Sequence, residues 1–134
     1  MKQCSLLIVN CCERESPYAE ALEQRGFRVT VLKEWPSDAV VLDSQVVVVV
    51  LRNLETICML AARMRAKPRF GRRILIGLAP AVSAADRRTA IGAGFDDVVA
   101  ESGGTRVLIA RILRALHSRP EHRCFLPELK RRAA

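Results

Sequence analysis

The chain has 134 residues, a formal net charge of +8 at pH 7 and a hydrophobic content of 50%. This length is enough for one domain with its own hydrophobic core, which excludes a miniprotein that depends on disulfides. No uncharged apolar stretch is long enough to cross a membrane, and residues 1–5 lead directly into a short strand without the apolar segment of a secretory signal. We therefore expect a cytoplasmic protein with no membrane contact.

The first half of the chain predicts short strands that alternate with helices. Ser5–Val9 is a strand by its apolar run, and Phe27–Leu32 is a second one. Between them, Ser16 followed by proline predicts a helix start, and Gly26 predicts the helix end. The chain before the next strand leaves room only for a brief helix over Asp38–Leu42.

The run Val46–Leu51 is an unbroken apolar segment rich in β-branched residues. Such a run predicts a central strand of a parallel sheet that is buried on both faces. Further strands are expected at Ile74–Leu78 and Asp97–Ala100. Helices are expected over Leu54–Ala66, from a capping box at Ser83 to a stop at Gly94, and from a Thr105 cap to about Ser118.

The last of these helices has a clear apolar stripe and a basic outer face. Leu108, Ile109, Ile112, Leu113 and Leu116 form the stripe that should face the sheet. Arg111 and Arg114 are expected to face out. On the earlier helix, over Leu54–Ala66, the apolar positions are Leu54, Ile57, Cys58, Ala61, Ala62 and Met64.

This alternation predicts an α/β fold: a doubly wound sheet of five parallel strands with about five helices, the second of them short or absent. Residues 1–118 form the domain. Residues 119–134 read as a basic C-terminal extension or linker, because they contain two prolines and only a short apolar patch.

The basic residues are concentrated in two segments. Residues 105–134 carry eight Arg or Lys against two Glu, and a second cluster contains no acid: Arg63, Arg65, Lys67, Arg69, Arg72 and Arg73. Such patches attract nucleic acid, anionic ligands or acidic proteins. Few aromatic residues accompany them, and no helix-turn-helix or RNA-binding signature is present. We therefore expect nucleic-acid binding only through a possible separate output domain.

The cysteines are not spaced as a metal site or a redox pair. They are expected to be reduced and mostly buried, and we expect no metal and no cofactor. The adjacent pair Cys11 and Cys12 is the exception worth testing, because a thiol at the end of a strand is reactive if its pKa is lowered. The full set is Cys4, Cys11, Cys12, Cys58 and Cys124.

The order of elements, and above all the segment A-x-x-A-G-x-D-D at residues 90–97, resembles the receiver domain of two-component response regulators. The resemblance covers roughly Cys4 to Ser118. It implies a flavodoxin-like fold and a role in bacterial two-component signalling. Within the segment, Asp96 and Asp97 are expected to shape the turn into the fifth strand by side-chain to backbone hydrogen bonds.

The residues with which a receiver is phosphorylated are absent from the matching positions. The acidic pair that binds magnesium matches Asn10 and Cys11, and the phosphoacceptor aspartate matches Leu51. The serine or threonine that ends strand four matches Leu78 or Ala79, and the lysine that ends strand five matches Glu101. The resemblance therefore points to a degenerate receiver.

Each of these losses has a chemical consequence. Magnesium prefers hard oxygen ligands, which an amide and a thiol do not replace well. Leu51 cannot serve as a carboxylate nucleophile, and Glu101 would repel a phosphoryl group. Asp43 could end a strand of its own, but that would leave too little chain for the preceding crossover. We expect no phosphorylation by the family's mechanism, no catalytic residue and no enzyme activity.

The leading hypothesis is a phosphorylation-independent signalling module that acts through protein contacts, as an adaptor or a homodimer. Arg106, Arg111 and Arg114 mark the outer part of the last helix, in the region that receivers commonly use for dimer or partner contacts. One alternative is the regulatory half of a DNA-binding transcription regulator. Others are a residual enzyme that uses Cys11 or Cys12, and a sensor of an anionic small ligand. That ligand would bind in the emptied pocket or at Arg69, Arg72 and Arg73.

Overall fold

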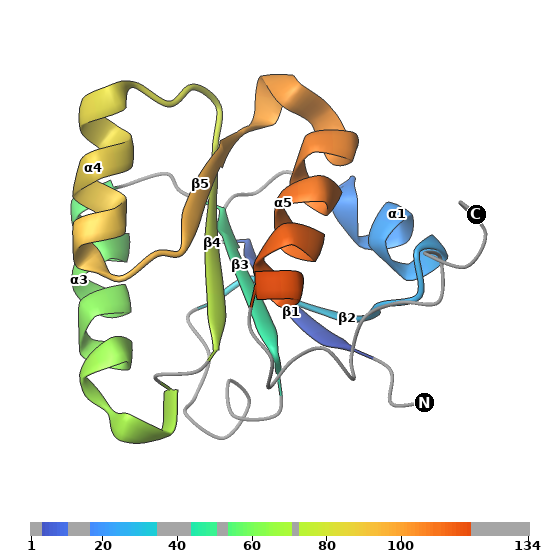
Figure 1. The fold of residues 1–134 in the computed structure, drawn as a ribbon, viewed down its shortest axis with the longest axis horizontal. Coiled ribbons are helices and arrows are strands. Elements are labelled where there is room, and N and C mark those ends of the chain that lie inside the picture. The colour runs from blue at the N-terminus through green and yellow to red at the C-terminus, as the bar shows by residue number, and fades with distance from the viewer. Residues whose placement is uncertain (1–3, 11–16, 35–43, 51–53, 71–72, 119–134) are drawn as a thin grey trace.

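Five parallel strands form one sheet in the order β2-β1-β3-β4-β5 (Figure 1). The computed structural model describes residues 4–10, 17–34, 44–50, 54–70 and 73–118. Every hydrogen-bonded pair of neighbouring strands is parallel, as the sequence predicted. The strands are β1 (Ser5–Asn10), β2 (Arg28–Leu32), β3 (Val46–Val50), β4 (Ile74–Ala79) and β5 (Asp97–Ala100).

The valine strand β3 lies at the centre of the sheet, between β1 and β4. All five of its residues are buried. Val46, Val48 and Val50 belong to one hydrophobic core, and Val47 and Val49 belong to a second core on the opposite face. Because successive side chains of a strand point to opposite faces, a run of valines is the pattern that a doubly covered strand requires.

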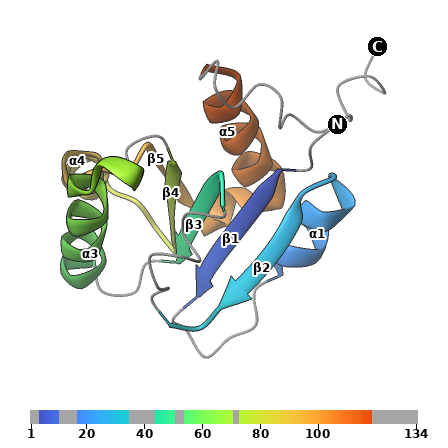
Figure 2. The same ribbon diagram turned by 90° about the horizontal axis from the view of Figure 1, so that it is seen from below.

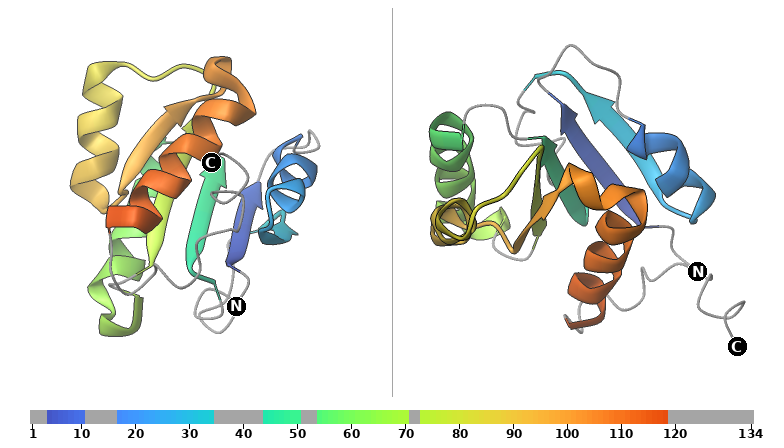
Figure 3. Two further views of the ribbon diagram at one scale, coloured as in Figure 1. Left: turned by 45° about the vertical axis from the view of Figure 1, so that its right-hand side comes forward. Right: turned by 90° about the horizontal axis from the view of Figure 1, so that it is seen from above.

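Two helices cover each face of the sheet (Figure 2). Helices α1 (Tyr18–Gln24) and α5 (Gly104–Ser118) pack on the face of Val48, and α3 (Leu54–Ala66) and α4 (Ala84–Ala93) pack on the face of Val47. Figure 3 shows the two pairs on opposite sides. This is a doubly wound sheet, and α3 has the bounds that its apolar periodicity predicted.

The ends of α4 follow the capping signals in the sequence. The Ser83 Oγ accepts a hydrogen bond from the Asp86 backbone N–H at 3.0 Å. Gly94 ends the helix with φ of +119°, and a Cβ there would lie 2.6 Å from the Arg65 Cγ. Both the left-handed backbone and the close arginine therefore require glycine at this position.

Several details of the helices differ from the sequence prediction. Helix α5 begins at Gly104, one residue before the expected Thr105 cap, and a short 3-10 helix, η2 (Glu101–Gly103), precedes it. Pro17 is the N-cap of α1 and makes no side-chain cap bond. Ala62 was expected on the apolar side of α3 but is exposed. A second 3-10 helix, η1 (Pro68–Phe70), follows α3.

Two further predictions fall outside the described residues: the brief helix over residues 38–42 and the extension over 119–134. Within the part of the chain that the structure describes, no helix combines the length and the apolar character needed to cross a membrane.

Candidate functional site

The strand register brings two of the expected pocket residues, Asn10 and Leu78, into one row at the carboxyl edge of the sheet, with Ala79 next to it. Asn10 of β1 pairs with Val50 of β3, and Val50 pairs with Leu78 of β4. Ala79 pairs with Ala100, the last residue of β5. The parallel strands thus end side by side, as a pocket beyond their carboxyl ends requires.

This row is apolar except at Asn10 and just after β5. Leu78 is fully buried, Val50 and Asn10 are buried, and Ala79 is half-buried. None of the five described strands ends in a carboxylate. Cys11 and Leu51, which match the family's acidic positions, lie outside the described residues.

Glu101 follows β5 directly and makes the charge at this end of the row negative. Burial raises the pKa of the Tyr18 hydroxyl above its ordinary value of 10.0, and the charge of Glu101 raises this pKa further. A carboxylate at this position disfavours a phosphoryl group, which is itself an anion.

The residues that the structure describes contain no group of three or more His, Cys, Asp or Glu that could hold a metal ion. The absence of a metal site and of a cofactor remains a prediction. Cys4 and Cys58 are buried free thiols, and burial raises the pKa of Cys58. Cys12, the other candidate nucleophile of the chain, lies in the segment 11–16 outside the described residues.

Away from this edge, the two aspartates at the start of β5 organise a network of arginines. The Asp96 Oδ2 accepts hydrogen bonds from the Leu75 backbone N–H and from the Arg65 Nη2, both at 2.7 Å. Arg65 also donates to the carbonyls of Gly94, at 2.8 Å, and Arg73, at 2.6 Å. Arg65, which the sequence grouped with a surface patch, therefore joins α3 to β5 with a side chain that is only 17% exposed.

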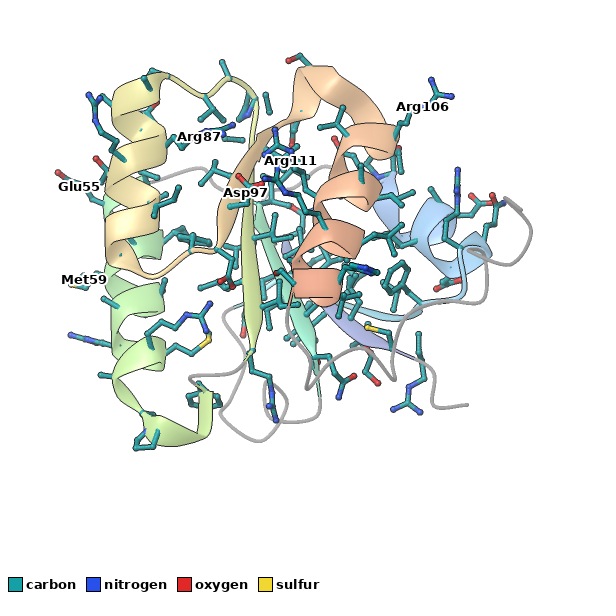
Figure 4. All side chains as sticks on the ribbon, viewed as in Figure 1. Glu55, Met59, Arg87, Asp97, Arg106 and Arg111 are labelled. Carbon is teal, nitrogen blue, oxygen red and sulfur yellow. The ribbon has the colours of Figure 1, made fainter. Side chains whose placement is uncertain are left out.

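Asp97 binds arginines from both neighbouring helices (Figure 4). Its Oδ2 accepts a hydrogen bond from the Arg111 Nη1 of α5 at 2.8 Å, and its Oδ1 lies 3.9 Å from the Arg87 Nη1 of α4. Oδ1 also accepts from the Val98 backbone N–H at 2.8 Å. The side-chain to backbone bond that was expected of Asp97 at the turn into β5 is present, whereas Asp96 bonds to the Leu75 backbone of β4. The ion pairs of both aspartates are contacts that the sequence did not indicate.

A groove of about 560 Å³ runs over this network between α4 and α5. Arg111 and Arg114, two of the three expected interaction residues, line the groove, and Arg106 does not. Figure 4 shows Arg106 on the far side of α5 from Arg87 and Arg111. The complete lining is Arg87, Asp96, Asp97, Arg111, Arg114, Ala115 and Ser118.

The structure refines the role of each arginine on this face. Arg111 was expected to face out, but its side chain is only 33% exposed because it bonds to Asp97. Arg114 is exposed and makes no ion pair with the described residues. Arg87 is the groove residue that sequence reasoning missed, because nothing in the sequence of α4 indicates that it reaches β5.

Of the arginines expected to bind an anionic ligand, Arg69, Arg72 and Arg73, the described side chain is that of Arg73, and it does not adjoin the carboxyl edge of the sheet. Arg73 precedes β4 at the amino edge of the sheet, whereas Leu78 and Ala79 lie at the carboxyl edge. Arg72 and the side chain of Arg69 lie outside what the structure describes. A smaller pocket of about 180 Å³ beside the carboxyl edge has no basic residue in its lining, which is Leu54, Ala79, Pro80, Ala81, Val82, Asp86 and Val98.

No protein family model and no curated protein matches the chain. Solved structures do match. A response regulator from Thermotoga maritima is 20% identical with a TM-score of 0.71 over 85% of this chain and 98% of that one. The receiver domain of a DNA-binding response regulator from Colwellia psychrerythraea is 17% identical, with a TM-score of 0.62 over 86% and 99%.

A third similar structure is described as an atypical orphan response regulator with a phosphorylation-independent regulatory mechanism. It is 18% identical, with a TM-score of 0.67 over 84% of this chain and 95% of that one. Together, these likenesses show that the chain has the fold of response regulator receiver domains. The resemblance that the sequence indicated is thereby confirmed at the level of the fold.

Proposed function

We propose that this protein is a receiver-like regulatory module that works without phosphorylation and acts through protein contacts, as a homodimer or as an adaptor to a partner. The observation that carries the proposal is the chemistry of the carboxyl edge. The fold aligns Asn10, Val50 and Leu78 at the carboxyl edge, where a receiver gathers the residues of its phosphorylation site, and Leu78 is fully buried. An apolar row of this kind offers no nucleophile for phosphoryl transfer and no carboxylate pair for magnesium.

The comparison with solved structures supports the same proposal. One protein with this fold is described as an atypical orphan regulator that works independently of phosphorylation. A protein with this fold can therefore regulate without phosphorylation. In this chain, the surface best suited to protein contacts is the α4–β5–α5 face, by which we mean α4, β5, α5 and the groove that they line.

The first experiment tests the absence of phosphorylation. The chain is incubated with magnesium and a small-molecule phosphodonor, and its intact mass and backbone amide spectrum are recorded before and after. We expect no added phosphate and no shift of the amides of Asn10, Leu78 or Glu101. A receiver with its acidic residues present serves as the positive control. A phosphorylated form of this chain would contradict the proposal.

A second candidate is the regulatory half of a DNA-binding regulator. It is favoured by the likeness to the receiver domain of a DNA-binding response regulator, nearly all of which the match covers. An output domain would then follow residues 119–134. Immunoblotting of cell extract tests this candidate. If the candidate is right, the native product should be larger than the 14.9 kDa of this chain.

A further inference from the structure

We infer that the groove of the α4–β5–α5 face binds an acidic segment of a different protein, and not a second copy of this chain. The inference rests on the proposed function, because it specifies the partner of the surface proposed there. It depends on three features of the groove: the donors that its arginines still offer, the way in which Asp97 holds them, and the absence of acids on α5.

The arginines of the groove keep N–H donors that their contacts within the chain do not use. A guanidinium carries five N–H donors in a flat arrangement that fits a carboxylate. Arg111 is bonded through Nη1 to Asp97, and Arg87 donates its Nη2 to the Val98 carbonyl at 3.1 Å. Arg114, at the same groove, is exposed and pairs with no carboxylate of the described residues. Three guanidinium groups from two helices thus converge on one open groove.

Asp97 holds two of these arginines in place before a partner arrives. It lies between Arg87 of α4 and Arg111 of α5, and its own side chain is 19% exposed. Fixing a side chain in advance reduces the conformational entropy that binding must otherwise remove. The ion pairs of Asp97 therefore orient the arginines toward an incoming anionic group and leave some of their N–H donors for it.

A second copy of this chain is poorly suited to fill the groove. In an isologous dimer the same patch is present on both subunits, so the arginines of one must find acids on the same face of the other. Helix α5 contains no acidic residue. Asp96, just before β5, and Asp97 of β5 already bind Arg65, Arg87 and Arg111 within the subunit. Two such faces would bring excess positive charge together, in a chain whose net charge is +8.

The acidic residue of α4, Asp86, does not supply a carboxylate for the arginines of a second copy. Asp86 is exposed, but it lines the pocket beside the carboxyl edge and not the groove. An isologous contact centred on the groove therefore has no unpaired carboxylate among the described residues that line it.

The lining also favours carboxylates of a protein over the phosphates of a nucleic acid. The lining contains no aromatic residue on which a base could stack. Ala115 and Ser118 are small, and so leave room between the arginines for a peptide segment.

A selection of random displayed peptides tests the inference while the natural partner is still unidentified. The library is selected on the native chain and on two variants, Arg114→Glu and Arg106→Glu. These two variants change the net charge equally on the same helix, but only Arg114 lines the groove. We expect acid-rich peptides from the native chain and from Arg106→Glu. The strongest of these peptides should bind Arg114→Glu about tenfold or more weakly, with less than about a twofold change for Arg106→Glu.

Sedimentation equilibrium and an oligonucleotide binding assay are run on the same proteins. We expect a monomer at all concentrations and no oligonucleotide binding that differs between the two variants. If the native chain is a dimer that dissociates in Arg114→Glu but not in Arg106→Glu, the inference of an acidic partner is overturned, but the proposed function still stands. Peptides without acid enrichment, or equal losses in both variants, would overturn the inference. Oligonucleotide binding lost only in Arg114→Glu, with no acid-rich peptide selected, would overturn both.

Discussion

The carboxyl edge of the sheet and the α4–β5–α5 face have opposite chemistry within one domain. At the edge, Asn10, Val50 and Leu78 are buried next to one another and no described strand ends in a carboxylate. On the face, Asp96 and Asp97 bind arginines from three different helices. The ion pairs that join described residues to one another are thus concentrated at the start of the last strand.

This contrast shows which parts of the fold are needed for its stability. The sheet is held by buried apolar side chains, such as those of β3 on both faces and Leu78 near the end of β4, and not by charged groups at the strand ends. The edge can therefore lose its acidic chemistry while the strand order is kept. By the same reasoning, the ion pairs of β5 serve to fix neighbouring elements and not to specify the fold.

The largest effect is expected at the edge itself, from Leu78→Thr. This change places a hydroxyl where the receiver family has one, but it removes buried apolar volume and buries a polar group. The free energy of unfolding should fall by about 3 kcal/mol, measured by urea denaturation. Ala79→Thr is the matched control. Ala79 is half-buried, and its substitution should lower the same free energy by less than about 1 kcal/mol. Similar losses in both variants would show that the edge is not packed as core.

A smaller effect is expected from Arg65→Met, which keeps an unbranched apolar stem but removes the bonds of Arg65 to Asp96 and to the carbonyls of Gly94 and Arg73. Because these groups are part-buried and would lose a partner, the free energy of unfolding should fall by about 2 kcal/mol. Arg63→Met, on the exposed side of the same helix, should change it by less than about 0.5 kcal/mol. Indistinguishable variants would mean that the Asp96 network does not stabilise the domain.

Asp97→Asn weakens the attraction of Arg87 and Arg111 while keeping an oxygen that can accept from the Val98 N–H. The ion pairs are partly exposed, so the loss in unfolding free energy should be about 1 kcal/mol at low salt. Salt screens such pairs, and the difference from the native chain should therefore shrink at high ionic strength. Asp86→Asn, which alters an exposed acid that lines the smaller pocket and not the groove, is the control. A loss that is independent of salt would contradict this account.

The smallest effect concerns the pH dependence of Tyr18, the only tyrosine of the chain. Its pKa in the folded state is raised above 10.0, first by burial and second by Glu101. Below pH 10 the hydroxyl is neutral in both states, so its contribution to stability is fully present. As the pH rises through the raised pKa, the unfolded chain releases this proton more readily and stability is lost.

Tyrosinate absorbance measures this titration directly, because a single group gives the signal. Glu101→Gln removes the charge but not the burial, so the midpoint should move down toward 10.0 without reaching it. Asp86→Asn removes one charge elsewhere and should leave the midpoint where it is. An unchanged midpoint in Glu101→Gln would show that the charge of Glu101 does not reach Tyr18.

Side-chain patterning along the chain was enough to predict the strands of the sheet and most of the helices that cover it. The valine run predicted a doubly buried central strand, the apolar spacing indicated the bounds of α3, and Ser83 with Gly94 predicted both ends of α4. These features depend on side-chain periodicity and local backbone geometry, which can be seen in a short stretch of sequence. The starts of α1 and α5 were less accurate, because a cap competes there with neighbouring turns.

The pairing of charged side chains could be seen only from the packing of the helices on the sheet. Periodicity placed Arg106, Arg111 and Arg114 on the outer part of one helix, but the position of β5 selects Arg111 for Asp97 and leaves Arg106 on the other side. Arg87 joins the same network from α4. A helical pattern tells which way a side chain leaves its own helix. Its partner depends on how the elements pack against each other, and that packing brings together residues that are far apart in the chain.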